Sequence, residues 1–303
     1  MKKLAILSIM LICGILLSSC GNQSSADLKD FQTQLNKVED EKKDLKTVMD
    51  KIHLKQLDQL SKTDTTDKNK REFEALQKDI NKHLIPQFKK YEKSAKHLPA
   101  EHQDVKDLKN KYLENVKQEK QSIYDIKTFV DLCNKSIKAN EDILDYTKLF
   151  ESNRSQVETQ IKKANNQEDA NQLTSKIESN NQNLKEAAQK YLESDDTNSK
   201  KAIDEHIKPL IEKQITELNQ TNITDPKVNS ARKNAIEMYY NLLNYYDTRE
   251  TTIEIEKKLS KIDVEKLPKT GKELSKDNNG VYEELKKLKK QEIDIVDKIK
   301  IFG

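Results

Sequence analysis

The chain has 303 residues, of which 35% are charged and 34% are hydrophobic, and it contains 5 glycines, 5 prolines and no tryptophan. Folds with dinucleotide or phosphate loops need glycine where the backbone turns tightly or approaches a ligand. After residue 21 the only glycines are Gly271, Gly280 and Gly303, so those folds are excluded. Charges of both signs are interleaved, with a net charge of +3 and few arginines, which argues against nucleic-acid binding.

The first twenty residues predict where the protein resides. A basic start precedes an apolar run over 4–17, which has the length of a secretory signal and is too short for a stable membrane span. The run ends in Leu-Ser-Ser-Cys, which resembles the lipobox of bacterial lipoproteins. We therefore expect cleavage between Ser19 and Cys20, with residues 1–19 removed and diacylglycerol and palmitate-type chains on Cys20. Two or more acyl chains hold a protein on a bilayer, so we expect an anchored protein at the extracytoplasmic face of the cell membrane, with 20–25 as a tether.

Taken in chain order, apolar residues recur every three or four positions and predict long helices. The first covers about 24–61 and the second about 73–95, with a kink at Pro86 because proline lacks a backbone N–H. The third keeps one apolar face over about 105–144. So long a stripe needs a partner helix to cover it.

The remaining chain continues in the same way, and no long stretch alternates with the period of a strand. Further helices are expected over about 151–196, 203–218, 226–262 and 281–299, with a loop over 261–280. The predicted fold is all-α, a long-helix bundle of coiled-coil-like hairpins. A turn-forming stretch near residue 196 predicts a boundary between an N-terminal bundle, 26–196, and a C-terminal helical region, 197–303.

One sequence pattern occurs twice. Ile-x-x-His-x-x-Pro stands at residues 80–86 and again at 203–209, which is 123 residues later. A duplicated helical hairpin would explain this spacing. Chance matching in a chain rich in Lys, Ile and Leu would explain it equally well, and the sequence leaves both explanations open.

The candidate chemical groups do not assemble into a known motif. The five histidines lack the spacing of a helical metal site, and Cys133 lies on an apolar stripe with no base nearby, which predicts an inert thiol. Residues 267–271 match the sortase pentapeptide Leu-Pro-x-Thr-Gly, but no membrane-crossing run follows, so we expect a loop between helices. The sequence predicts no catalytic residue, no metal and no cofactor.

The densest aromatic cluster lies in the helix expected over 226–262. On a helix Tyr239 and Tyr246 share a face, Tyr240 points elsewhere, and inward packing of the tyrosine rings is the favoured interpretation. The alternative is an interaction face, since tyrosine and methionine are enriched in interfaces. The residues of this candidate face are Glu237, Met238, Tyr239, Tyr240, Tyr245 and Tyr246.

The lipobox, the Lys- and Asn-rich helical body and the tetrad Glu-Met-Tyr-Tyr at 237–240 together resemble the EMYY-motif lipoproteins of low-GC Gram-positive bacteria. This resemblance implies a cell-surface lipoprotein and no particular reaction. The first half is also similar, more weakly, to cell-wall-binding helical lipoproteins of the YkyA type, through Ile85-Pro86, Tyr91 and Tyr112-Leu113.

The sequence therefore predicts a membrane-anchored, extracytoplasmic lipoprotein of non-catalytic binding or scaffold type. The expected partners are the membrane, through the N-terminal lipid, and a cell-wall polymer or an envelope protein; self-association stays open. The alternative is an enzyme or a metal-dependent protein whose site is assembled from distant His, Tyr and carboxylate residues.

Overall fold

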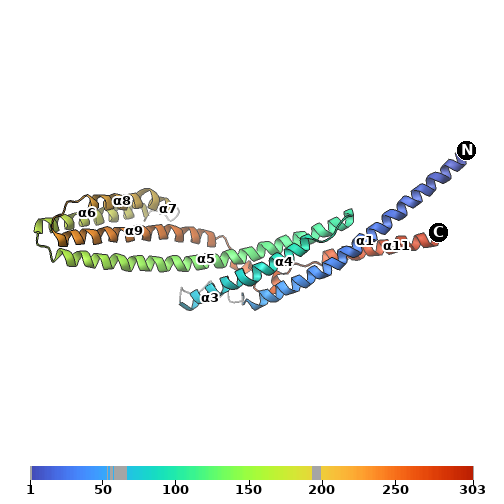
Figure 1. The fold of residues 1–303 in the computed structure, drawn as a ribbon, viewed down its shortest axis with the longest axis horizontal. Coiled ribbons are helices and arrows are strands. Elements are labelled where there is room, and N and C mark those ends of the chain that lie inside the picture. The colour runs from blue at the N-terminus through green and yellow to red at the C-terminus, as the bar shows by residue number, and fades with distance from the viewer. Residues whose placement is uncertain (1, 53, 55–56, 58–66, 193–198, 303) are drawn as a thin grey trace. The chain divides into compact units, whose positions relative to one another are not determined.

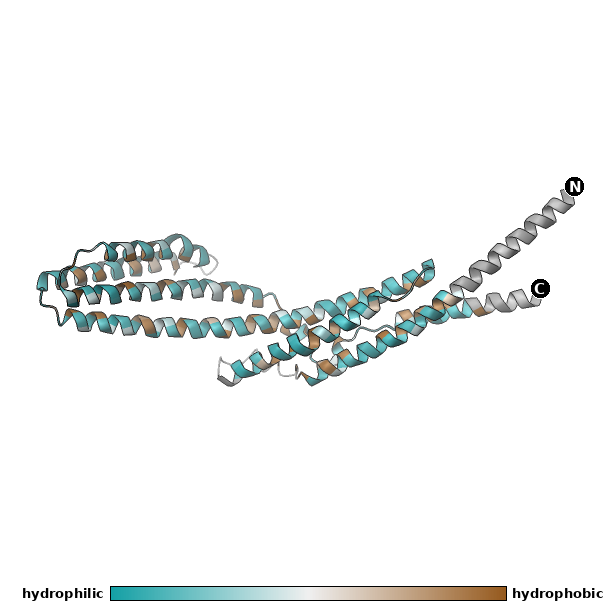
Figure 2. Cartoon of the chain, viewed as in Figure 1, coloured by the Kyte–Doolittle hydropathy of each residue, from teal (hydrophilic) through white to brown (hydrophobic). Residues whose placement is uncertain are grey.

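The computed structural model describes residues 2–52, 54, 57, 67–192 and 199–302 (Figure 1). Within these ranges the side chains of residues 2–24, 67–68, 292 and 294–302 are not described. The described part of the chain is helical and contains no strand, which confirms the all-α prediction. Figure 2 shows apolar and polar residues interleaved along the helices, as expected for helices with one buried stripe. The elements in chain order are α1 (Lys2–Lys51), α3 (Asp67–Asp79), η2 (Ile80–Leu84), α4 (Ile85–Lys96), α5 (Gln103–Ile161), α6 (Gln167–Leu192), α7 (Ser199–Ala202), η4 (Ile203–Ile207), α8 (Lys208–Asn219), α9 (Pro226–Leu259), η5 (Val264–Lys266), α10 (Gly271–Leu274) and α11 (Asn279–Phe302).

The chain divides into two compact units. Unit 1 consists of residues 1–131 and 263–303, and unit 2 consists of 132–262. The boundary expected at residue 196 therefore falls inside unit 2. The physical reason is the core, because Leu184 before that position and Ile207 after it belong to the same hydrophobic cluster.

Unit 1 is built around α1, α4 and the first part of α5. The recurring apolar residues of α1 face the interior, as predicted. Helices α4 and α5 bury large aromatic rings against them. Burial of such rings is the main favourable contribution to packing of these helices. The fully buried large side chains include Phe31, Leu35, Leu45, Met49, Phe88, Tyr91 and Tyr112.

The long helix α5 continues past the end expected from the sequence. It runs without interruption from Gln103 to Ile161, and it contains neither glycine nor proline. Residues 140–156 include no buried residue, so the thinner apolar pattern there reflects lower burial and not a new element. The break comes at 162–166, where the Asn166 Oδ1 accepts hydrogen bonds from the amides at the start of α6.

The kink predicted at Pro86 is a π-helical turn, and a turn of the same kind precedes Pro209. In η2 the Ile85 amide donates to the Ile80 carbonyl, and in η4 the Lys208 amide donates to the Ile203 carbonyl. The wider turn places the proline that follows in the first turn of α4 or α8, where a backbone N–H is not required. The repeated sequence pattern thus has the same local structure in both units.

The two units also share a contact in which an aspartate side chain accepts hydrogen bonds from two successive backbone amides. The Asp27 Oδ2 at the start of the folded part of α1 accepts from the amides of residues 101–102 at 2.9 and 2.8 Å. The Asp169 Oδ2 in α6 accepts from the amides of residues 224–225 at 2.8 and 2.7 Å. These two turns are again 123 residues apart, which favours the duplicated hairpin over chance.

Candidate functional site

A buried ion pair lies at the centre of unit 1. Lys42 of α1 and Glu119 of α5 have side chains only 3% and 1% exposed, and the Lys42 Nζ lies 2.7 Å from the Glu119 Oε1. The same Oε1 accepts the Lys276 amide at 2.8 Å, and the Lys42 Nζ donates to the Lys276 carbonyl at 3.3 Å. The pair therefore holds α1, α5 and the segment before α11 together.

Two buried tyrosines extend this polar layer. The Tyr91 hydroxyl donates to the Tyr112 hydroxyl at 3.3 Å, and that hydroxyl donates to the Glu39 Oε1 at 2.9 Å. Burial raises the pKa of Tyr91 well above its ordinary value, and the Glu119 carboxylate raises it further. Burial and Glu39 do the same to the pKa of Tyr112. Both hydroxyls stay protonated near neutral pH, so they act as hydrogen-bonding groups and not as bases.

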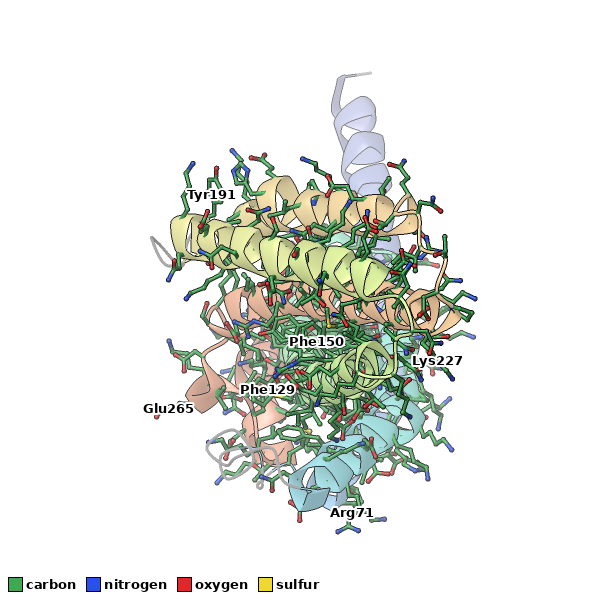
Figure 3. The ribbon with its side chains drawn as sticks, turned by 90° about the vertical axis from the view of Figure 1, so that its left-hand side faces the viewer. Arg71, Phe129, Phe150, Tyr191, Lys227 and Glu265 are labelled. Carbon is green, nitrogen blue, oxygen red and sulfur yellow. The ribbon has the colours of Figure 1, made fainter. Side chains whose placement is uncertain are left out.

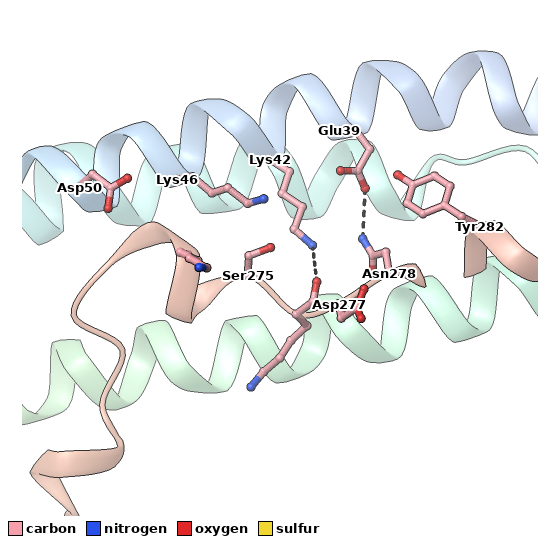
Figure 4. A pocket seen from close by; sticks show the side chains of 10 residues that line it. Glu39, Lys42, Lys46, Asp50, Ser275, Asp277, Asn278 and Tyr282 are labelled. Carbon is pink, nitrogen blue, oxygen red and sulfur yellow. Dashed lines mark hydrogen bonds between the residues drawn. The ribbon is translucent and has the colours of Figure 1, made fainter. Parts of the chain in front are cut away.

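An open, polar pocket of about 520 Å³ adjoins this layer, between α1 and residues 272–282 (Figure 4). Glu39 and Asp50 line one side, where Glu39 accepts from the Asn278 Nδ2 at 3.1 Å and Asp50 accepts from the Gly271 amide at 2.7 Å. Lys46, Lys272 and Ser275 contribute further polar groups. The pocket can accept a small polar group.

The Leu-Pro-x-Thr-Gly segment is a packed joint on α1. Leu267 is only 6% exposed and Gly271 is buried. The Thr270 side chain caps α10 by accepting from the Glu273 amide at 3.2 Å. A Cβ atom on Gly271 would lie 2.5 Å from the Lys46 carbonyl oxygen, so only glycine allows this approach. The segment connects helices, as predicted.

The tetrad at 237–240 is divided between core and surface. Met238 and Tyr239 are buried at 2% and 0% exposure, whereas Glu237 is exposed and Tyr240 is 45% exposed. The Tyr239 hydroxyl donates to the Asn181 Oδ1 at 2.9 Å, and burial raises its pKa above the ordinary value. Inward packing is therefore confirmed for Tyr239, and only the first and last residues of the tetrad reach solvent.

The rest of the candidate face lies further along α9. Tyr245 and Tyr246 are half-buried and meet edge to face, with ring centroids 5.2 Å apart. A smaller pocket of about 280 Å³ in unit 2 is lined by Met238 and by Phe150 of α5. In Figure 3 Phe150 lies among the helices, while Lys227 projects outward. The six predicted residues thus do not form one continuous surface.

The histidines occupy separate positions. His83 and His206 are exposed, and His206 stacks on Tyr191 with centroids 3.8 Å apart. The His102 Nδ1 lies 3.3 Å from the Asp27 Oδ2, while His53 falls outside the described residues. Within the described residues no group of three or more His, Cys, Asp or Glu is placed to hold a metal ion. Cys133 is a half-buried free thiol whose pKa burial raises to about 12.

The polar layer of unit 1 was not among the residues predicted from sequence. Its signal was visible, because Lys42 interrupts the apolar stripe of the first helix and Glu119 interrupts that of the third. A lysine and a glutamate at inward positions carry opposite charges, so each could neutralise the other if the two helices packed together. Periodicity alone does not show that two such positions face each other.

The N-terminal predictions lie outside the described side chains, which begin at residue 25; this applies to both Ser19 and Cys20. None of the described helices is both long enough and apolar enough to span a membrane.

The fold and the anchoring signal define a helical lipoprotein. The model of one family, the EMYY-motif containing lipoproteins, matches residues 1–289. The chain belongs to this family, and it is accordingly a membrane-anchored lipoprotein. No curated protein and no solved structure shows significant similarity to it.

Proposed function

We propose that the protein is a non-catalytic binding or scaffold lipoprotein of the extracytoplasmic face, held by diacylglycerol on Cys20. The main support for this proposal is the polar layer of unit 1. There Lys42, Glu119, Tyr91 and Tyr112 form ion pairs or hydrogen bonds with one another or with the backbone. These side chains converge from distant positions, and their hydrogen bonds stabilise the packing of helices.

The tether supports a role close to the membrane. Among the described side chains of α1, which begin at residue 25, the first buried ones are Asp27 and Leu28, seven and eight residues after Cys20. A fully extended chain of seven residues spans at most about 25 Å. Unit 1 is therefore held within about that distance of the lipid, with the end formed by Asp27 and residues 101–102 nearest to it.

The proposed partner is a cell-wall polymer or an envelope protein. Tyr240 is an exposed aromatic residue beside Glu237, and such residues are enriched at binding surfaces. The polar pocket on α1 offers a second place for a polar group of the partner. Neither surface requires a reaction.

Cell fractionation tests the anchor. Cys20→Ala should move the protein from the membrane fraction to the medium, since the acyl chains provide the attachment. Cys133→Ala is the matched control and should leave the protein in the membrane fraction. Retention of the Cys20→Ala protein in the membrane fraction would contradict lipid anchoring.

Site-specific crosslinking tests the binding surface. A photoreactive residue at Tyr240 should give a discrete crosslinked species in intact cells, while the same residue at exposed Lys213 in α8 should not. Equal crosslinking at both positions, or none at either, would remove this surface from the proposal.

A further inference from the structure

Helix α11 runs antiparallel to α1, towards the end of unit 1 from which the tether leaves. Near its start, the Asn278 Nδ2 donates to the Glu39 Oε1 at 3.1 Å. Further along, the Lys289 Nζ donates to the Gln32 Oε1. Residue numbers rise along α11 as they fall along α1, so α11 approaches the level of the lipid attachment.

The same register shows where the folded part of unit 1 ends beside α11. Counting four residues on from the Lys289–Gln32 contact places Ile293 level with Leu28, the first buried apolar residue among the described side chains of α1. On the side of α11 that faces α5, the Lys111 Nζ lies 2.8 Å from the Glu284 Oε2. Counting from that contact places Gln103, the first residue of α5, level with the residue before Ile293. Ile293 is 61% exposed, although α11 continues to Phe302.

Exposed lysines gather on this part of α11. Lys286, Lys287 and Lys290 are all exposed, and Lys286 makes an ion pair at 2.9 Å with Glu283 of its own helix. Beyond Ile293 the sequence over 294–302 contains two lysines, two aspartates and the apolar residues Ile, Val, Ile, Ile and Phe.

We propose that residues 286–293 of α11 form a second membrane contact, in which the lysines bind the phosphate groups of anionic lipids and Ile293 enters the interface. A basic, amphipathic helix has this affinity. The inference rests on the proposed lipid at Cys20, which sets the end of unit 1 that faces the bilayer. Attachment at two points would fix the orientation of unit 1, which a single attachment at Cys20 does not do.

Vesicle sedimentation tests this contact on the chain from Gly21 onward, which carries no lipid. Vesicles of equal parts phosphatidylglycerol and phosphatidylcholine should sediment the protein, and pure phosphatidylcholine vesicles should not. Each lysine near an anionic surface contributes about a fivefold change in binding constant. Lys286→Gln, Lys287→Gln and Lys290→Gln together should therefore weaken binding about a hundredfold, and 0.5 M salt, which screens such charges, should do likewise.

The matched control removes three exposed lysines from unit 2, with Lys213→Gln, Lys227→Gln and Lys233→Gln, and should bind as the unsubstituted chain does. Ile293→Asp should weaken binding without removing a lysine, and circular dichroism should show unchanged helix in every variant. Equal loss in both triple variants, equal binding to the two kinds of vesicle, or no binding by the unsubstituted chain would overturn the proposal. Because the protein tested is unlipidated, such a result is independent of the fractionation of Cys20→Ala.

Discussion

At the centre of unit 1, α1 and α5 meet through Lys42 and Glu119, whereas α6 and α9 of unit 2 carry Leu184 and Leu242 at the corresponding places. Lys42 lies fifteen residues after Asp27, as Leu184 does after Asp169. Glu119 and Leu242 each lie seventeen residues after the turn that the aspartate holds. The positions that carry a buried ion pair in unit 1 thus carry apolar side chains in unit 2.

The difference reflects what covers each unit. In unit 1 the ion pair also binds both backbone groups of Lys276, in the segment that leads into α11. A buried pair of charges contributes little net stability, but it disfavours any arrangement that leaves a charge unpaired. We infer that the pair specifies where residues 271–282 dock, a task that unit 2 does not have because its fourth helix is part of α5.

The largest expected effect comes from breaking this pair. Glu119→Leu leaves the Lys42 ammonium buried without its carboxylate, which should lower the free energy of unfolding of unit 1 by about 3–5 kcal/mol. Adding Lys42→Leu reproduces the pair of leucines of unit 2 and should recover most of the loss. Hydrogen exchange of the backbone amides in α1 and α5 measures the loss in the single variant and the recovery in the double variant. A double variant as unstable as the single one would show that the two centres are not equivalent.

A smaller effect is expected at the joint that only unit 1 has. Gly271→Ala would place a methyl group 2.5 Å from the backbone of Lys46, which should cost about 1–3 kcal/mol by overpacking and loosen α10 from α1. Gly280→Ala is the control, because its new methyl group meets only the flexible Lys111 side chain, at 3.3 Å. Thermal unfolding and hydrogen exchange of α10 distinguish the two.

Acid should affect unit 2 more steeply than unit 1. Hydrogen bonds from the Asp225 amide and from Thr224 lower the pKa of Asp169, and the Asn166 amide together with that of Lys227 lowers the pKa of Asp225. Burial raises the pKa of Asp27, but hydrogen bonds from His102 and Glu101 outweigh it and lower the value.

Carboxylates with a lowered pKa stabilise the fold above their unfolded value of about 4 and lose that contribution as the pH falls through the folded value. In unit 2 two such carboxylates, Asp169 and Asp225, hold the turn before α9. In unit 1 Asp27 alone holds the equivalent turn before α5, because His102 occupies the position that corresponds to Asp225. Hydrogen exchange between pH 5 and 2.5 should show α6 and α9 opening before α1 and α4. Asp169→Asn should flatten this dependence in unit 2 alone.

The smallest effect concerns the tetrad. Tyr239→Phe removes the hydrogen bond to Asn181 and should lower the stability of unit 2 by about 1 kcal/mol. Tyr240→Phe changes an exposed side chain and should leave stability unchanged. Equal effects in urea unfolding would contradict the division of the tetrad between core and surface.

Much of the local structure could be predicted from the sequence. The stripe from Leu28 to Met49 is buried as expected, and both prolines mark a local change in helical geometry. The end of α5 was misplaced, because half-buried residues after 140 look like the end of a stripe when no partner helix is known. The boundary at 196 was misplaced because a turn does not show whether the cores on its two sides are shared.

The sequence by itself determined the helical class and the inward face along most of the described helices, and it predicted a lipid at Cys20, since these depend on residues close together in the chain. Only the tertiary structure decided that Lys42 meets Glu119, that residues 267–271 pack on α1, and that α5 contributes to both units. An apolar stripe or an inward charge requires a partner without naming it, and the partners here lie tens to hundreds of residues away.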